Sequence, residues 1–402
     1  MPLHTVLLLF LVAASPAMAQ DFDLRPGAAE RLRIYEAGGH GMEPGGSADG
    51  FLFSVAVPEG DYRVTVRLGD TRQAGDTTVK AEARRLMLNH VVTRRGETVE
   101  RSFLVNVRTP ALTPPPPNAP GGNGVRIDPR DSAELTWDEK LTLEFLGKPV
   151  VQSVRIEPVR APTVFLAGDS TVTDQYAEPA ASWGQMLPAM LDDRVVVANH
   201  AKSGATMKSF LTDLRFDKLL SGMKAGDWLF IQFGHNDQKV EWPQTYADAA
   251  IAYPAYLRAY IAEARRRGAQ PVLVTSPERR NFDEGGRIRD TLGAYAQAVR
   301  RVATQETVPL IDLNADSRAI YEALGPDVAP TAFNDGGRDK THHNDYGAWL
   351  MASAVAERIR ANVPGLATHV TMPAFSPARP PAASAVPIAP SLIRSDQRPA
   401  GN

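Results

Sequence analysis

The residues best suited to chemistry begin at a serine that follows an apolar run. Gly168-Asp-Ser-Thr171 comes directly after the apolar residues 164–167. A short apolar run bounded by glycine predicts a buried strand, and sites in parallel α/β sheets gather at the carboxyl ends of strands. Ser170 is therefore a candidate nucleophile, although Gly-Asp-Ser taken alone also forms turns and helix caps.

A serine hydroxyl needs a base to accept its proton, and the candidate base lies near the other end of the chain. Asp339 and His342 are three residues apart within Asp339-Lys-Thr-His-His-Asn-Asp-Tyr-Gly347. On a tight turn, this spacing lets the carboxylate reach the imidazole, fix its tautomer and stabilise the imidazolium. Two alternatives stay open here: His343 as the base, and a metal-binding turn formed by His342, His343 and Asp345.

Two further loops are candidates for an oxyanion hole. Residues 199–205 follow the second apolar run of the C-terminal half, and residues 231–237 follow the third. Gly204 lets a backbone N–H approach a ligand without a side chain in the way. Asn236 carries a side-chain amide that can donate to a developing oxyanion. Each loop taken singly is equally readable as a plain turn.

The four segments together resemble the four sequence blocks of the SGNH hydrolase superfamily. The matching residues, in chain order, are Gly168-Asp-Ser170, Gly204, Gly234-His-Asn236-Asp and Asp339-x-x-His342. The longer strings Phe165-Leu-Ala-Gly-Asp-Ser-Thr-Val, Phe233-Gly-His-Asn-Asp-Gln and residues 339–348 resemble the rhamnogalacturonan acetylesterase family in particular. This resemblance covers roughly residues 162–362. The N-terminal part, with Phe53-Ser-Val-Ala-Val-Pro-Glu-Gly-Asp-Tyr62, resembles the galactose-binding-like sandwich that precedes some bacterial esterase domains.

The resemblance implies a fold, a set of roles and a substrate class. The expected fold is a flavodoxin-like three-layer α/β structure with a parallel sheet, without metal or organic cofactor. Ser170 is expected to attack an acetyl ester, with His342 rather than His343 as the base and Asp339 orienting it. The backbone N–H groups of Ser170 and Gly204 and the Asn236 amide are expected to hold the oxyanion. His343 departs from the threonine or phenylalanine expected in many members.

The expected substrate is acetylated plant cell-wall polysaccharide, in particular rhamnogalacturonan. Acetylated xylan or another acetylated glycan is the first alternative. The second is a carbohydrate-binding protein without catalytic activity, although four intact blocks argue against it. The sequence indicates no oligomeric state.

The pattern of apolar runs predicts the elements that position these residues. After Pro162, short apolar runs at 163–167, 195–199, 228–233, 272–275 and 308–312 alternate with helical patterns. This alternation predicts a parallel sheet with helices on both faces. Before Pro162, alternating β-formers such as those at 62–68 and 102–108 predict an all-β sandwich.

Composition excludes several classes of function. The formal net charge is −2, from 44 basic and 46 acidic residues, so no global field favours nucleic acid or membrane. Cysteine is absent, which excludes disulfides and thiolate chemistry. A pectic substrate carries carboxylates, so local cations should bind it. The candidate cations beside the motifs are Lys202, Lys208, Lys239, Arg279 and Arg280, and His235 is a further candidate for a substrate contact.

Shifts in composition predict four segments. Residues 1–19 are expected to be a signal peptide, since a short apolar run ends in Ala17-Met-Ala19, and export would make the protein secreted or periplasmic. Residues 20–158 are expected to form the sandwich domain and residues 159–368 the esterase domain. Residues 369–402 are rich in Pro, Ala and Ser, which predicts a disordered tail.

Overall fold

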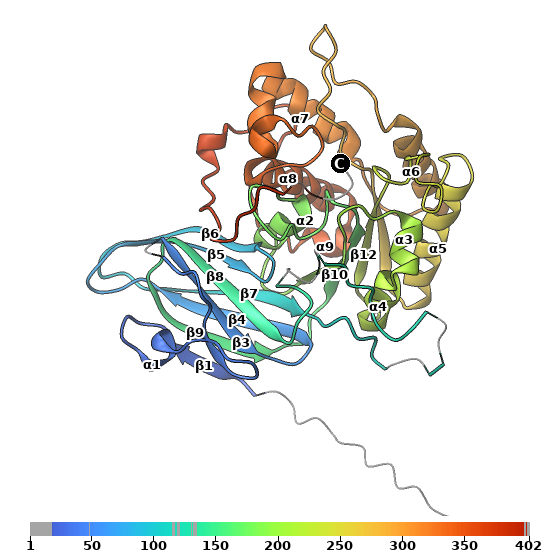
Figure 1. The fold of residues 1–402 in the computed structure, drawn as a ribbon. Helices are drawn as coiled ribbons and strands as arrows, with labels where there is room; N and C mark the ends of the chain where they lie inside the picture. Colours follow the sequence, from blue (N-terminus) through green and yellow to red (C-terminus); the bar gives the residue numbers. More distant parts are fainter. Residues whose placement is uncertain are drawn as a thin grey trace, which may run out of the picture.

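The computed structural model describes residues 18–397, except 48, 115–116, 119–120, 130 and 132–134, together with residue 399. The chain forms an antiparallel β-structure in its N-terminal part and a helix-covered sheet in its C-terminal part (Figure 1). The predicted signal peptide lies outside the described residues except for its last two positions. Within the described part of the chain, no helix is long and apolar enough to cross a membrane.

Two antiparallel sheets form the N-terminal part. One has the strand order β1 (Gln20–Asp23), β9 (Val151–Pro158), β4 (Gly60–Leu68) and β7 (Val99–Val107), and the other β2 (His40–Met42), β3 (Gly50–Ala56), β8 (Lys140–Lys148), β5 (Gly75–Ala81) and β6 (Arg85–Thr93). In β4, Tyr62, Val64 and Val66 are buried and alternate with less buried residues, as in a strand with one covered face. They share one core with Phe53 and Phe145 of the other sheet, so the sheets pack face to face.

A five-stranded parallel sheet forms the centre of the C-terminal part. Its order is β11 (Val196–Asn199), β10 (Thr163–Gly168), β12 (Trp228–Gln232), β13 (Gln270–Val274) and β14 (Leu310–Ile311), and all neighbours are parallel. Each of the five predicted apolar runs overlaps one of these strands. The register sets Gly168 opposite Gln232, so the segments that follow β10 and β12 leave the sheet at the same edge.

Helices cover both faces of this sheet, which confirms the predicted three layers. The bounds are α2 (Trp183–Met186), α3 (Met207–Thr212), α4 (Arg215–Gly222), α5 (Ala252–Arg266), α6 (Gly293–Glu306), α7 (Leu313–Val328), α8 (Asp345–Asn362) and α9 (Pro364–Ala367), with α1 (Ala29–Leu32) in the N-terminal part. Phe165 and Ala167 of β10 share a core with α3 to α6, whereas Val164 and Leu166 share the opposite core with α2, α7 and α8. Short 3₁₀ helices lie at Leu187–Met190, Ala329–Ala332, Asp335–Gly337 and Ala383–Ala385.

We correct the prediction of a disordered tail, because residues 369–397 follow a defined course. Thr371 N–H donates to the Met190 carbonyl at 2.9 Å. Farther along, Glu178 N–H donates to the Ile393 carbonyl at 3.0 Å, and Ser391 is only 2% exposed. The prediction failed because composition does not reveal backbone partners that lie elsewhere in the chain. The antiparallel strands all lie within residues 20–158, but the division into separate domains stays a prediction.

Candidate active site

Ser170 lies two residues beyond the end of β10. A Cβ at Gly168 would come within 2.5 Å of Val172 Cγ2 and 2.9 Å of the Gln232 carbonyl oxygen, so only glycine fits where the chain leaves the strand. The Ser170 carbonyl accepts a hydrogen bond from Gln175 Nε2 at 2.7 Å, and the residue is 2% exposed. The loop after β10 therefore holds Ser170 through its backbone.

The predicted base reaches Ser170 from the segment before α8. His342 Nε2 lies 2.8 Å from Ser170 Oγ, and His342 Nδ1 lies 2.9 Å from Asp339 Oδ2. The other carboxylate oxygen, Asp339 Oδ1, accepts the backbone N–H groups of Thr341 at 2.8 Å and His342 at 3.0 Å. The three-residue spacing thus closes a tight turn, and the fold brings together two segments 172 positions apart.

The Asp339 carboxyl stays ionised despite its burial. Burial alone would raise its pKa, but the hydrogen bond from His342, the charge of that ring and the two backbone N–H groups outweigh burial and hold the pKa well below its usual range. A fixed negative charge therefore lies against Nδ1 of the imidazole, where it favours the tautomer that leaves Nε2 free to accept a proton.

The two predicted oxyanion loops lie beside the Ser170 loop, because Lys202 N–H donates to the Gly168 carbonyl at 3.1 Å and β12 pairs with β10. Gly204 has a φ of +79°, a conformation that favours glycine. Asn236 is 1% exposed, and its Nδ2 donates to the Ala205 carbonyl at 3.0 Å, which joins the two loops. An amide nitrogen has two hydrogens, so one remains after this bond. Burial raises the pKa of Asp237 to about 7, although its carboxyl accepts the N–H groups of Gly234 and Met207.

His343, the alternative base, points elsewhere. Its Nε2 lies 2.7 Å from Tyr321 Oη, and its ring packs against Phe333 with centroids 4.8 Å apart. Burial, followed by the nearby charge of His342, lowers the pKa of His343 to about 3. Of the two adjacent histidines, the one whose ring meets Ser170 is His342.

His235, predicted to contact substrate, is instead enclosed by protein. It is 2% exposed, its Nε2 lies 3.0 Å from the Pro277 carbonyl oxygen, and its Nδ1 lies 3.4 Å from Asp169 Oδ2. Burial would raise the pKa of Asp169, but the charge and hydrogen bond of His235 outweigh it and lower that pKa. His235 thus joins the loops that follow β10, β12 and β13, and its contact with substrate stays a prediction.

Two of the predicted substrate-binding cations also have partners within the protein. Lys202 Nζ lies 3.2 Å from both Asp128 Oδ2 and Asp213 Oδ2. The Arg280 guanidinium donates to the carbonyls of Gly337 and Asp339. Charges counted along the sequence do not reveal the acceptors that the fold brings to them, and the substrate contacts of Lys202 and Arg280 stay predictions.

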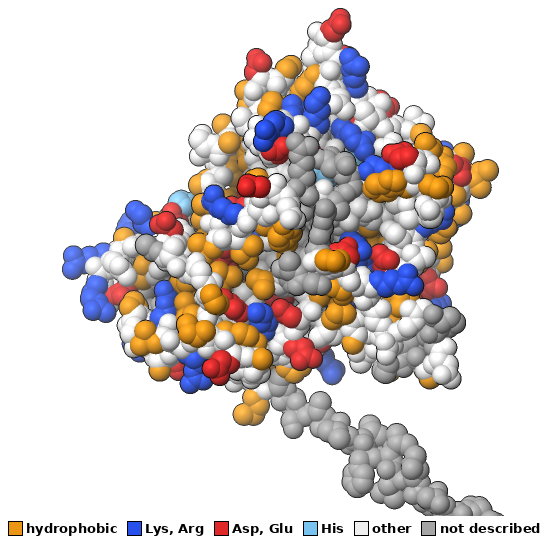
Figure 2. Space-filling view, in the orientation of Figure 1, with side chains coloured by type: hydrophobic (Ala, Val, Ile, Leu, Met, Phe, Trp, Pro, Cys, Tyr) orange, Lys and Arg blue, Asp and Glu red, His pale blue; other side chains and the backbone are white. Residues whose placement is uncertain are grey.

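The substrate contact of Arg279, the third of these cations, also stays a prediction. Its guanidinium contacts the neutral Thr291 hydroxyl at 3.3 Å and the neutral His235 carbonyl at 3.4 Å, and the residue is partly exposed. On the face shown in Figure 2, basic and acidic side chains are interspersed rather than gathered into one patch. The face in Figure 2 therefore offers a polyanion separate cations rather than one basic patch.

Gln175 is a site residue that the sequence analysis missed. Its Nε2 donates to the Ser170 carbonyl at 2.7 Å, and its Oε1 accepts from Ser203 Oγ at 3.5 Å, next to Gly204. One side chain thus connects the loop of the nucleophile candidate with the first oxyanion loop. A glutamine five residues after a Gly-Asp-Ser segment carries no signal of this contact.

The residues considered as a metal-binding turn point in different directions. His342 faces Ser170 and Asp339, His343 faces Tyr321, and Asp345 accepts hydrogen bonds from Lys80 and Arg84. Among the described residues, no three or more His, Asp or Glu side chains gather as metal ligands do.

Several known proteins are similar in sequence to this chain. Residues 166–350 match the GDSL-like Lipase/Acylhydrolase family. Rhamnogalacturonan acetylesterase RhgT of Bacillus subtilis is 42% identical over 209 residues, which cover 49% of this chain and 88% of RhgT. The probable rhamnogalacturonan acetylesterase YesY of the same organism is 36% identical over 201 residues, covering 49% of this chain and 92% of YesY.

A solved structure extends the likeness to both parts of the fold. The crystal structure of protein YxiM from Bacillus subtilis has a TM-score of 0.50 and 23% sequence identity, and the match covers 86% of this chain and 98% of that one. The chain belongs to the GDSL-like lipase/acylhydrolase family, carboxylic ester hydrolases with the SGNH hydrolase fold. The fold and the enzyme class predicted from the four motifs are confirmed.

Proposed function

We propose that this protein is a serine carbohydrate esterase that removes O-acetyl groups from rhamnogalacturonan through an acetyl-enzyme on Ser170. The observation that carries the proposal is the series of contacts from Ser170 Oγ to His342 Nε2 at 2.8 Å and from His342 Nδ1 to Asp339 Oδ2 at 2.9 Å. A hydroxyl, an imidazole and a buried carboxylate in this order convert serine into a nucleophile.

The reaction follows from this order of groups. Ser170 Oγ attacks the acetyl carbonyl carbon while His342 Nε2 accepts the hydroxyl proton. Asp339 holds the ring and stabilises the imidazolium that forms. His342 then gives the proton to the departing sugar oxygen as the bond between that oxygen and the acetyl carbon breaks. Water, deprotonated by His342, attacks the acetyl carbon of the acetyl-enzyme. The bond from that carbon to Ser170 Oγ then breaks, His342 returns the proton to Oγ, and acetate leaves.

The oxyanion of each tetrahedral intermediate needs donors at the same edge of the sheet. We assign the backbone N–H groups of Ser170 and Gly204 and the second Nδ2 hydrogen of Asn236. In support, the Asn236 amide is held by the Ala205 carbonyl and is buried, so it need not reorganise during the reaction.

The substrate assignment draws on the relatives and on one cation. RhgT carries the name rhamnogalacturonan acetylesterase and is 42% identical across most of its length. Rhamnogalacturonan carries galacturonate carboxylates, and Arg279 offers a planar fork suited to a carboxylate. Arg279→Met should raise the KM for acetylated rhamnogalacturonan fragments and leave the KM for uncharged 4-nitrophenyl acetate unchanged. An equal loss on both substrates would remove Arg279 from the substrate site.

Acetate release across three polymers tests the proposed function. Acetylated rhamnogalacturonan, acetylated homogalacturonan and acetylated xylan are offered at equal acetyl concentration, with Ser170→Ala as the control for background hydrolysis. We expect release to be fastest from rhamnogalacturonan. Faster release from xylan would redirect the substrate assignment. Binding of a polymer without acetate release would indicate a carbohydrate-binding protein.

We also propose that the protein is exported, as the predicted signal peptide implies. Cleavage after Ala19 would make Gln20 the mature N-terminus. Sequencing the N-terminus of the protein recovered from the periplasm or the medium tests this. Recovery in the cytoplasm with residues 1–19 intact would contradict it.

A further inference from the structure

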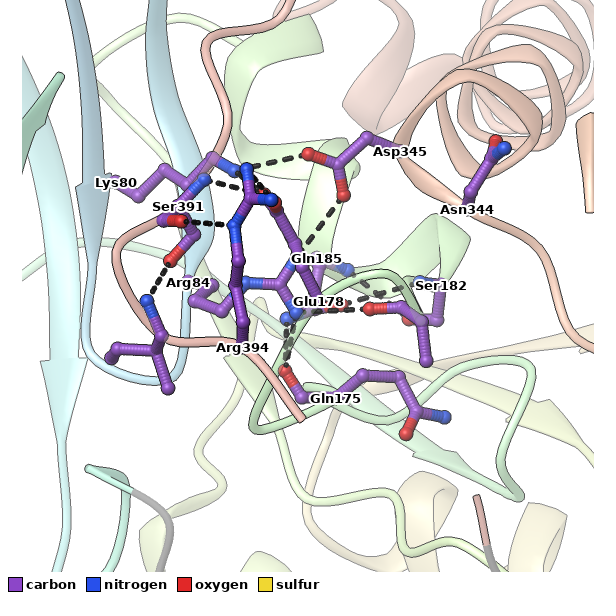
Figure 3. Close-up of polar contacts among 12 residues, drawn as sticks. Lys80, Arg84, Gln175, Glu178, Ser182, Gln185, Asn344, Asp345, Ser391 and Arg394 are labelled. Carbon is purple, nitrogen blue, oxygen red and sulfur yellow. Dashed lines mark hydrogen bonds and ion pairs between the residues drawn. The ribbon is translucent and has the colours of Figure 1, made fainter. Parts of the chain in front are cut away.

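A turn of the sandwich inserts an arginine into the esterase part. The turn joins β5 to β6, and both Glu82 and Arg84 adopt positive φ angles there, of 54° and 62°. These angles are uncommon for residues other than glycine and mark a constrained turn. Arg84 is only 1% exposed, although arginine is seldom fully buried. Its side chain points away from its own sheet into a polar cluster (Figure 3).

The Arg84 guanidinium binds two separate segments of the esterase part. Nη1 donates to the Gln175 carbonyl at 3.1 Å and to the Ala180 carbonyl at 2.9 Å, both in the loop that follows Ser170. Nη2 donates to Asp345 Oδ1 at 3.1 Å. Asp345 is the first residue of α8, three positions after His342. One planar group thus spans the Ser170 segment and the His342 segment.

The contact on the serine side continues to the nucleophile itself. Arg84 fixes the backbone of Gln175, and the Gln175 side chain donates to the Ser170 carbonyl at 2.7 Å. Gln185 Nε2 also donates to the Gln175 carbonyl, at 2.9 Å, and to the Ala83 carbonyl of the same turn, at 2.7 Å. Two side chains therefore tie this turn to one peptide group close to Ser170.

The charges around Arg84 are balanced within the cluster. Lys80 Nζ lies 2.9 Å from Glu178 Oε1 and 3.0 Å from Asp345 Oδ2, and Arg84 Nη2 lies 3.4 Å from Glu178 Oε1. The C-terminal segment contributes Ser391 N–H, which donates to Glu178 Oε1 at 2.7 Å. The more exposed Arg394 lies 3.7 Å from Glu178 Oε2. Losing Arg84 would leave the buried Lys80 as the cation shared by both carboxylates, and it would remove the guanidinium that bridges the Ser170 loop and Asp345.

We propose that Arg84 is a positioning residue for ester hydrolysis. It sets the distance between the Ser170 segment and the His342 segment. Through Arg84, the sandwich contributes to the geometry of the active site. The inference rests on the proposed function. A displacement of about 1 Å between reacting groups can cost about 10²-fold in rate, so the Ser170–His342 contact is sensitive to this anchor.

The test compares Arg84→Met with a matched control at the same interface. Lys218 of α4 is also a buried cation that binds the N-terminal part: its Nζ donates to Glu59 Oε1 at 2.6 Å and to the Ala111 carbonyl at 2.6 Å. Its partners lie in neither catalytic segment. We expect Arg84→Met to lower kcat on 4-nitrophenyl acetate by about 10- to 100-fold with KM within about twofold. Lys218→Met should keep kcat within about twofold.

The outcomes separate this inference from the proposed function. Wild-type protein without esterase activity would overturn the proposed function. Active wild type with an equal kcat loss in both Met variants, or with none in Arg84→Met, would overturn the positioning role alone. If Arg84→Met does not fold, Arg84→Lys takes its place, because lysine keeps the charge but lacks the planar fork. We expect Arg84→Lys to lower kcat and Lys218→Arg to leave it unchanged; an unchanged kcat in Arg84→Lys would contradict the inference.

Discussion

Replacing His343 by glutamine should reduce, by about one, the number of protons that this protein takes up when it unfolds at pH 5. His343 is buried with a pKa of about 3, against 6.5 for an exposed histidine. The native ring is therefore neutral at pH 5, whereas the unfolded ring is almost fully protonated. Because the unfolded state binds more protons, the stability contributed by neutral His343 is complete above pH 6.5 and is lost as the pH falls toward 3.

The magnitude follows from the two pKa values. Between pH 7 and pH 5, protonation of the unfolded ring lowers the free energy of unfolding by about 2 kcal/mol. Glutamine does not titrate and can still form a hydrogen bond with Tyr321 Oη, which lies 2.7 Å from the imidazole Nε2. Between pH 7 and pH 5, the free energy of unfolding of His343→Gln should therefore fall by about 2 kcal/mol less than that of wild type.

The assay measures protons taken up on denaturation at pH 5, by calorimetry in buffers of different ionisation enthalpy. The groups common to both proteins cancel, so the variant should take up about one proton fewer than wild type. Equal uptake by the two proteins would show that burial does not keep His343 neutral and would refute the reasoning.

Three further predictions follow from the site and the interface. Asn236→Ala should lower kcat by about 10²–10³-fold with little change in KM, because its bond to the oxyanion matters mainly in the transition state; an effect on KM alone would make it a ground-state contact. Arg280→Met should reduce kcat equally on polymer and on 4-nitrophenyl acetate, since Arg280 holds the Asp339 carbonyl, and a loss confined to charged polymer would identify it as a substrate contact. Deleting residues 20–158 should give insoluble or inactive protein, because it removes the Lys80 and Arg84 anchors of Asp345 and exposes the surface of the esterase part that the sandwich covers; a soluble fragment with full activity would contradict this.

The sequence predicted best those elements and contacts whose residues lie close together in the chain. The apolar run before Ser170 forms the predicted strand. The contact between Asp339 and His342 spans three residues, so its spacing is visible in the sequence. Contact between His342 and Ser170 was predicted only through the resemblance, since 172 positions separate them.

The contacts that the sequence did not predict join groups that are distant in the chain. Lys202 and Arg280 looked free at strand ends, but acceptors from other loops bind them. No catalytic motif marked Arg84 in the sequence, and only the fold brings it to Asp345, 261 positions away. Polar residues that are buried against distant partners have no periodicity or spacing that composition reveals.

The chemical identity of the nucleophile is tested most directly by labelling. Active protein is treated with a serine-directed organophosphonate, which bonds covalently to an activated hydroxyl, and is then analysed by intact mass and peptide mapping. We predict one label per chain, located on Ser170, with activity lost in proportion to labelling and with no label in His342→Ala. Inactivation with the label on another residue, or esterase activity that persists while Ser170 is fully labelled, would contradict the account.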